Sequence, residues 1–208
     1  MSDPSVSTPT TDVAFSPAVK AVQTKRGSRQ AYERVEARGG WSNEVTPDLA
    51  SFIAERDSFY LATSNAEGQP YVQHRGGPKG FLRVVDSRTL GFADFRGNRQ
   101  YITLGNLAEN DRAFIFLMDY EHQARVKIWG RARVVEDDPA LVARLTVEGY
   151  DAKPEQAILF MIEAWDGNCR QHIPQMIAAA DVAAAIDSLK RQIAQLEQQS
   201  AALRLTSG

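Results

Sequence analysis

The stretch "ARVKIWGRARVVED", residues 124–137, decides the class of fold. Val126, Ile128 and Ala132 alternate with charged or aromatic residues, which is the pattern of a β-strand with one buried face. The run is long, and Gly130 stands in its middle, where a glycine often marks a bulge or a bend. A long strand that bends at a glycine suits the closure of a β-barrel.

Other apolar or alternating segments predict further strands at 58–64, 71–77, 80–86, 90–95, 113–120 and 156–165. Short helices are expected over 99–110 and 138–149. A further helix begins after Thr46, whose side chain can cap it, with Pro47 in its first turn. About six or seven strands at close spacing, with only short helices between them, are typical of an antiparallel barrel rather than a parallel βαβ sheet.

The composition excludes several classes of protein. A chain of 208 residues that is 43% hydrophobic can build a core, and it fits one domain with extensions or two small ones. The net charge of −2 gives no overall attraction to nucleic acid or to an anionic membrane. The single cysteine, Cys169, excludes an intrachain disulfide and suits a reducing compartment. Residues 1–12 are too polar for a signal peptide, and no apolar run approaches the roughly 20 residues of a membrane span, so we expect a soluble cytoplasmic protein.

The two ends of the chain differ from its middle. Residues 1–14, rich in Ser, Thr and Pro, are expected to be disordered, and residues 15–45 to form a helical extension before a barrel over 46–175. Residues 176–205 predict one long helix, because apolar positions recur at alternating spacings of four and three over about three heptads. This heptad row consists of Val182, Ile186, Leu189, Ile193, Leu196, Ser200 and Leu203. It must pack either on the barrel surface or on the same helix of a second copy in a dimer, and the row alone favours neither.

The first candidate site is "RGNRQ", residues 96–100. Arg99 offers a fork of donors, Arg96 can add a second, and Gly97 lets the backbone approach a ligand closely. The helix that begins near Arg99 directs free N–H groups to the same place. The segment therefore predicts either a phosphate site or a solvated turn whose arginines pair with surface acids.

The second candidate is "QHRGGPKG", residues 73–80, which reads as an open loop between strands. A flat ligand can lie against such bare backbone, with Arg75 hydrogen-bonded to its edge. The alternative is a flexible hairpin connection. Arg75 beside Arg99 across neighbouring strands would favour the ligand site.

The third candidate is "WDGNCRQHIPQ", residues 165–175. Cys169 and His172 have the spacing of a zinc-ligand pair, but the chain offers only His74 and His122 as further histidine ligands. A Cys–His nucleophile pair is a second interpretation, although no orienting partner is evident. A crossing segment before the last helix and a set of polar contacts to a planar ligand are the remaining two.

The long strand supplies the fourth candidate. One of its faces carries Arg125, Lys127, Trp129, Arg131 and Arg133. A nucleic-acid-binding barrel of the OB type can use such a face, whereas a solvated outer face is the simpler interpretation. Trp129 is expected to cover something, because an indole rarely stands free on a wet surface.

These four segments, in this order, resemble the FMN-binding split barrel of the pyridoxamine 5′-phosphate oxidase-like superfamily. The pattern "YVQHRGG…GNRQYITLGNLAEN…NC-Q-HIP" carries the resemblance, which spans roughly residues 41–175 and is closest to the branch of predicted flavin-nucleotide-binding proteins. It implies a mainly β, α+β fold: an antiparallel split β-barrel of about six strands, here with N-terminal helices and a long C-terminal helix.

The resemblance also implies a homodimer with FMN at the interface. Asn98, Arg99 and Gln100 would hold the FMN phosphate. Residues 74–76 would line the isoalloxazine edge, and the remaining site residues would close the site, chiefly from the second subunit. The full implied set is His74, Arg75, Gly76, Asn98, Arg99, Gln100, Lys127, Trp129, Asn168, Cys169, Gln171 and His172.

The function implied is that of an FMN-dependent oxidoreductase, which moves hydride or electrons between a nicotinamide-type donor and a small molecule. The chain lacks the C-terminal Trp and Arg-x-His-like segment with which the oxidase grips its substrate, so the resemblance does not extend to pyridoxamine phosphate oxidation. A flavin carrier or sensor, a barrel that binds deazaflavin or haem, a nucleic-acid-binding barrel and an assembly module are the alternatives. No catalytic side chain or metal site is predicted.

Overall fold

The computed structural model describes residues 10–168 and 171–206, which form two compact units. The first contains the described residues up to 118 and from 125 to 168, and the second contains 119–124 and 171–206. The sequence predicts a helical extension, a barrel and a terminal helix along the chain, and these boundaries stay a prediction. In the structure, the extension and the barrel strands belong to one compact unit.

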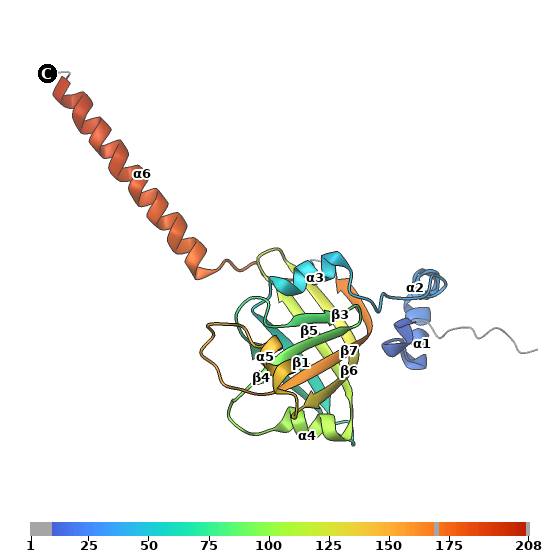
Figure 1. The fold of residues 1–208 in the computed structure, drawn as a ribbon. Coiled ribbons are helices and arrows are strands. Elements are labelled where there is room, and N and C mark those ends of the chain that lie inside the picture. Colours follow the sequence, from blue (N-terminus) through green and yellow to red (C-terminus); the bar gives the residue numbers. More distant parts are fainter. Residues whose placement is uncertain (1–9, 169–170, 207–208) are drawn as a thin grey trace, which may run out of the picture. The chain divides into compact units, whose positions relative to one another are not determined.

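Within the described residues, seven antiparallel strands form one sheet in the order β2-β1-β5-β6-β7-β4-β3 (Figure 1). The sheet curves like a barrel but does not close, which confirms the predicted α+β split-barrel class. The strands are β1 Ser58–Ser64, β2 Pro70–Gly76, β3 Arg83–Asp86, β4 Thr89–Phe95, β5 Arg112–Asp119, β6 Ala124–Val135 and β7 Pro154–Asn168. β3 is shorter than the predicted strand over 80–86, because Phe81 and Leu82 are buried in the core and the Phe81 N–H closes a turn onto Pro78.

The inner face of the sheet holds the core. Phe59 of β1 packs against Phe81 and Phe92, with ring centroids 5.4 and 5.2 Å apart. Ile128 of β6 and Ile162 of β7 are fully buried in the same cluster. A second cluster lies beneath α5 Pro139–Leu145, where Leu141 and Leu145 cover Ala93 and Ala157. Alternation along the strands therefore separates a barrel interior from an outer face, as the sequence predicted for β6.

Gly130 marks a bulge, as its place in the long strand predicted. The register between β6 and β7 shifts between Trp129 and Gly130. A Cβ at Gly130 would lie 2.1 Å from the carbonyl oxygen of Met161 and 2.5 Å from the Phe160 ring. Only glycine permits this close approach, and the bulge adds the twist that bends the sheet.

The described residues of the first unit also form five α-helices: α1 Pro17–Arg26, α2 Arg29–Glu36, α3 Pro47–Ala54, α4 Ile102–Glu109 and the α5 named above. The Thr46 hydroxyl accepts a hydrogen bond from the Leu49 N–H at 3.2 Å, which confirms the predicted cap. A short 3₁₀ helix, η1 Thr10–Val13, lies inside the segment predicted to be disordered. Thr11 of η1 is fully buried, so this part of the terminus packs onto the unit.

The second unit consists of the turn after β5 and the C-terminal segment. The Gln123 side chain donates a hydrogen bond to the Ile173 carbonyl at 2.7 Å, and the Met176 N–H donates to the Tyr120 carbonyl. The long helix α6, Ala179–Thr206, follows, as the heptad pattern predicted. None of the described helices combines the length and apolar character that crossing a membrane requires.

The open side of the barrel lies between β2 and β4, and we call it the seam. β2 is one edge of the sheet, and β4 is next to the other edge. An ion pair between Arg75 of β2 and Asp94 of β4 crosses the seam, with side chains only 12% and 11% exposed. Gln156 of β7 donates to the second oxygen of Asp94 at 2.8 Å. Side chains thus join two strands that share no backbone ladder.

We expect Asp94→Ala to lower the free energy of unfolding by about 3–5 kcal/mol, because it leaves the buried Arg75 cation and the Gln156 amide without their acceptor. Urea unfolding of the full chain measures the change. Glu55→Ala is the matched control: it breaks the ion pair with Lys79, whose side chains are 68% and 64% exposed, and should cost about 1 kcal/mol or less. Equal losses in the two variants would contradict a structural role for the seam pair.

Candidate functional site

A small pocket lies at the seam, and we call it the seam pocket. Its walls come from β2, from the end of β4, from the loop over 97–101, from the first turn of α4 and from the start of β7. The lining residues are Tyr71, Gln73, Arg75, Asp94, Phe95, Gly97, Asn98, Arg99, Gln100, Tyr101, Ile102, Thr103, Leu104 and Glu155. Its volume is about 50 Å³, which is small beside the roughly 300–1,000 Å³ of sites that enclose whole small molecules.

β2 sorts the predicted residues between its two faces. Arg75 stands opposite Phe59 in the ladder with β1, and Gln73 stands opposite Leu61, so both lie on the inner face. His74 stands opposite Tyr60 on the outer face, where the two rings meet at 5.5 Å. Gly76, on the same side as His74, is exposed. The structure therefore brings Arg75 to the seam pocket and leaves His74 and Gly76 on the opposite face of the strand.

Arg75 is the buried cation of the pocket. One guanidinium nitrogen pairs with Asp94, and the group lies over the Phe92 ring at 5.6 Å. Among the described residues, none accepts a hydrogen bond from Arg75 Nε, which is buried. A buried charged donor that no described residue matches is costly, so Arg75 is held in the pocket wall at some expense of stability.

The loop before α4 adopts a strained backbone. Arg99 and Tyr101 have φ values of 63° and 54°, in the left-handed region that non-glycine residues avoid at a cost of about 1–3 kcal/mol each. The Asn98 side chain accepts a hydrogen bond from the Gln100 N–H at 3.2 Å, which stabilises the turn. Strain of this kind persists where surrounding contacts enforce it, and it is common at ligand sites.

Arg99 projects from this loop as an exposed cation. Its Nε donates a hydrogen bond to the Tyr101 hydroxyl at 3.2 Å. That hydrogen bond is the largest cause of a raised pKa of Arg99, so the guanidinium keeps its charge. Because Tyr101 is also the residue before α4, the contact orients Arg99 beside the start of the helix.

The N-terminus of α4 forms the floor of the pocket and is held in place by side chains. Thr103 donates to the Gln73 side chain at 2.7 Å, and Asn106 donates to Thr63 at 2.9 Å. The first N–H groups of a helix have no acceptor within it and carry a partial positive charge. The pocket thus combines two arginines with a helix N-terminus, which is the donor set of an anion site.

Lys127 and Trp129 lie elsewhere, on the outer face of β6. The Trp129 ring stacks on Trp41 of the N-terminal extension, with centroids 4.8 Å apart and planes inclined by 15°. Lys127 pairs with Asp166 at 2.8 Å and lies 5.4 Å from the Trp129 ring. The expectation that Trp129 covers something is thus explained within the chain, and neither residue is among those that line the seam pocket.

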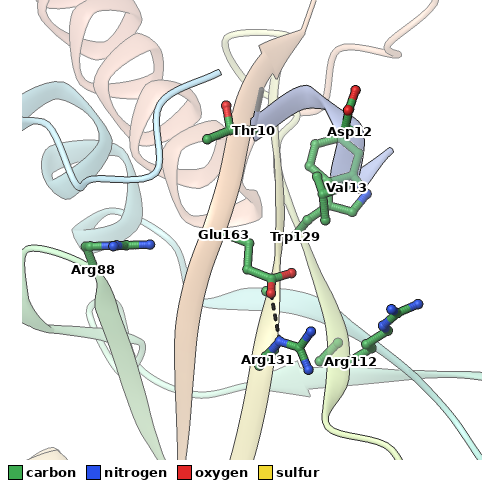
Figure 2. Close-up of a pocket in the computed structure, with 10 residues that line it drawn as sticks. Thr10, Asp12, Val13, Arg88, Arg112, Trp129, Arg131 and Glu163 are labelled. Carbon is green, nitrogen blue, oxygen red and sulfur yellow. Dashed lines mark hydrogen bonds and ion pairs between the residues drawn. The ribbon is translucent and has the colours of Figure 1, made fainter. Parts of the chain in front are cut away.

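The rest of the basic strand is partly neutralised. Arg131 pairs with Glu163 at 2.7 Å and with Asp111 at 2.8 Å. Figure 2 shows the pair of Arg131 and Glu163 in a second pocket of about 520 Å³, which Arg88, Arg112 and Asp12 also line. Charges of both signs occupy this face, which does not suit a nucleic-acid surface.

The third predicted segment is only partly described. Asn168 ends β7 and stands opposite Arg125 in the ladder with β6. Cys169 lies outside the described residues. Gln171 and His172 belong to the second unit, where His172 has a φ of 64°.

Several residues that line the seam pocket were not predicted from the sequence. Tyr71 and Gln73 share the parity of Arg75 along β2, so alternation within "YVQHRG" was a signal that could have found them. Asp94 and Thr103 gave no such signal, because each enters the site through a partner from a distant strand.

Solved structures with a similar fold come from several organisms. HupZ from Group A Streptococcus is 17% identical with a TM-score of 0.50, over 64% of this chain and 99% of that one. An FMN-binding protein from Syntrophomonas wolfei is 12% identical with a TM-score of 0.45, over 70% and 97% of the two chains. HutZ, the haem storage protein from Vibrio cholerae, is 17% identical with a TM-score of 0.41, over 58% and 92%. The likeness to HupZ shows a shared fold.

The sequence comparisons are consistent with this fold. No curated protein matches the chain. The family described as pyridoxamine 5′-phosphate oxidase matches residues 45–169, which include every strand and the whole seam pocket. Since the match extends over more than half of the sequence, the chain belongs to the pyridoxamine 5′-phosphate oxidase family.

Proposed function

We propose that the chain binds FMN, with the phosphate in the seam pocket, and acts as an FMN-dependent oxidoreductase. The observation that carries the proposal is the donor set of the seam pocket, where Arg75 and Arg99 line one cavity together with the first turn of α4. A phosphate monoester offers three acceptor oxygens and close to two negative charges, so it complements these donors.

The size of the pocket supports a phosphate subsite rather than a complete flavin site. About 50 Å³ holds a phosphate-sized group but leaves no space for a three-ring system. The ring system would therefore extend from the seam along an outer surface of the barrel. We infer that a second copy of the chain covers it there, so that the protein works as a homodimer.

In this arrangement the second copy would supply the site residues that the seam pocket lacks. Lys127 and Trp129 are rigidly held on β6 by Asp166 and Trp41, and a fixed outer surface of this kind suits contact with a partner. Asn168, Cys169, Gln171 and His172 belong to the same proposal, which follows the family resemblance.

Bound FMN would supply hydride or electron transfer between a nicotinamide-type donor and a small-molecule acceptor. The residues of this chain would bind and orient it. Arg75 would contribute its positive charge while Asp94 keeps the guanidinium fixed, and Asn98 and Gln100 would hold the loop that positions Arg99. Asp94 already accepts two hydrogen bonds from protein groups, so it is occupied as a structural anion rather than free to act as a base.

The phosphate assignment predicts that Arg99→Ala weakens FMN binding about 10- to 150-fold, because a charge-assisted hydrogen bond is worth about 1.5–3 kcal/mol. Titration calorimetry on the apoprotein measures the change. Riboflavin, which lacks the phosphate, should bind the variant and the unmodified protein equally. Arg144→Ala is the matched control, since Arg144 is an exposed cation on α5 and does not line the pocket. Undiminished FMN affinity in Arg99→Ala would refute the assignment.

The identity of the cofactor is tested on the purified protein. We expect a flavin absorption spectrum, FMN as the compound released on denaturation at about one per chain, and loss of the flavin absorbance when NADH or NADPH is added without oxygen. Catalysed turnover with an added electron acceptor would distinguish an enzyme from a carrier. A haem spectrum, a released deazaflavin, or a colourless protein that takes up no added FMN would overturn the proposal.

A further inference from the structure

The apolar heptad row of α6 is exposed along much of the helix. Between positions 182 and 196 it runs for about 21 Å, at 1.5 Å per residue. Its side chains are 44–63% exposed, and they are Val182, Ile186, Leu189, Ile193 and Leu196. A continuous row of large apolar side chains marks an interaction surface.

The spacing of the heptad row indicates the kind of partner. Its alternating spacing of four and three is a repeat of 3.5 residues, which stays on one face only when two helices supercoil around each other. The positions beside it hold polar side chains such as Lys190, Gln192 and Glu197. The stripe is thus narrower than the wider apolar face with which a helix packs onto a globular core.

The residue types in the heptad row indicate the number and direction of the paired helices. With Ile186 and Ile193 at a positions, Leu189 and Leu196 fall at d positions. Isoleucine at a and leucine at d is the combination that favours parallel, two-stranded coiled coils. We propose that α6 pairs with α6 of a second copy of this chain as a parallel, in-register, two-stranded coiled coil.

Ser200 distinguishes this arrangement from an antiparallel one. It occupies the a position after Ile193, one heptad further along the helix. In a parallel pair the two Ser200 hydroxyls face each other across the axis and can share a hydrogen bond. In an antiparallel pair that buries the same heptad row, each hydroxyl would instead be buried against Leu189 of the second copy without a polar partner. A polar residue at one a position also fixes the register.

The flanking charges allow the same pairing. In a parallel coil, each g residue lies beside the next e residue of the other helix. The resulting pairs are Ala185 with Lys190, Gln192 with Glu197, and Gln199 with Arg204. None brings like charges together, and two of them can form hydrogen bonds between an amide and a charged group.

Disulfide cross-linking of the full chain tests the proposal. In a Cys169→Ser background, Ser200→Cys places one thiol at an a position, and Gln198→Cys places it at the outward f position. Under mild oxidation we expect Ser200→Cys to form the covalent dimer at least tenfold faster than Gln198→Cys, because only facing a positions bring the Cα atoms within the roughly 4.4–6.8 Å that a disulfide requires. If the barrels associate while the α6 helices remain separate, the two thiols will cross-link at equal rates.

A second pair of variants tests whether packing of the heptad row sets the rate of cross-linking. Leu196→Glu, added to Ser200→Cys, should slow dimer formation at least tenfold, while Ala194→Glu places the same charge at an outward b position and should change the rate less than twofold. Equal rates for Ser200→Cys and Gln198→Cys would overturn the proposal. So would the absence of a cross-link at Ser200→Cys, since an antiparallel pair keeps these thiols about 16 Å apart along the axis. The experiment needs no flavin, so its failure is separate from failure of the FMN proposal.

Discussion

The open seam between β2 and β4 is the constraint on which the rest of the first unit depends. A closed barrel satisfies every backbone group by strand pairing, whereas a split one leaves two edges to be managed. Here side chains join the edge strand β2 to β4, the strand next to the other edge: Arg75 and Asp94 form a largely buried ion pair across the seam, and Thr103 ties α4 to Gln73 of β2. The seam is thus held together by polar groups in the place where a closed barrel would have a ladder.

This solution also creates the candidate site. Apolar residues could fill the seam with no charge to bury, and such replacements are often neutral or stabilising. The chain instead keeps a guanidinium with one donor that no described residue matches, and a loop with two left-handed residues, Arg99 and Tyr101. Local features that oppose stability are expected where a ligand supplies the missing interactions. The seam pocket therefore has the character of a binding site that a phosphate would complete.

Features that depend on neighbouring residues could be predicted from the sequence, whereas contacts between distant segments could not. The alternation of β6, its glycine bulge and the Thr46 cap depend on neighbouring residues, and each was found from its local pattern. The pairing of Arg75 with Asp94 and the stacking of Trp129 on Trp41 join segments whose proximity is set only by the complete sheet. The family resemblance located the loop over 98–100 but not the parity of β2, which separates Arg75 from His74.

The two proposed associations of this chain have the same symmetry. A parallel coiled coil and a barrel dimer with shared sites are both two-fold arrangements of identical chains, so one pair of chains can form both. A helix pair converts the second association into an intramolecular step, with an effective concentration that reaches the millimolar range for short flexible connections. A flavin site that is completed by a second copy, as proposed, would gain most from such a tether, because the site would then assemble even when the protein is dilute.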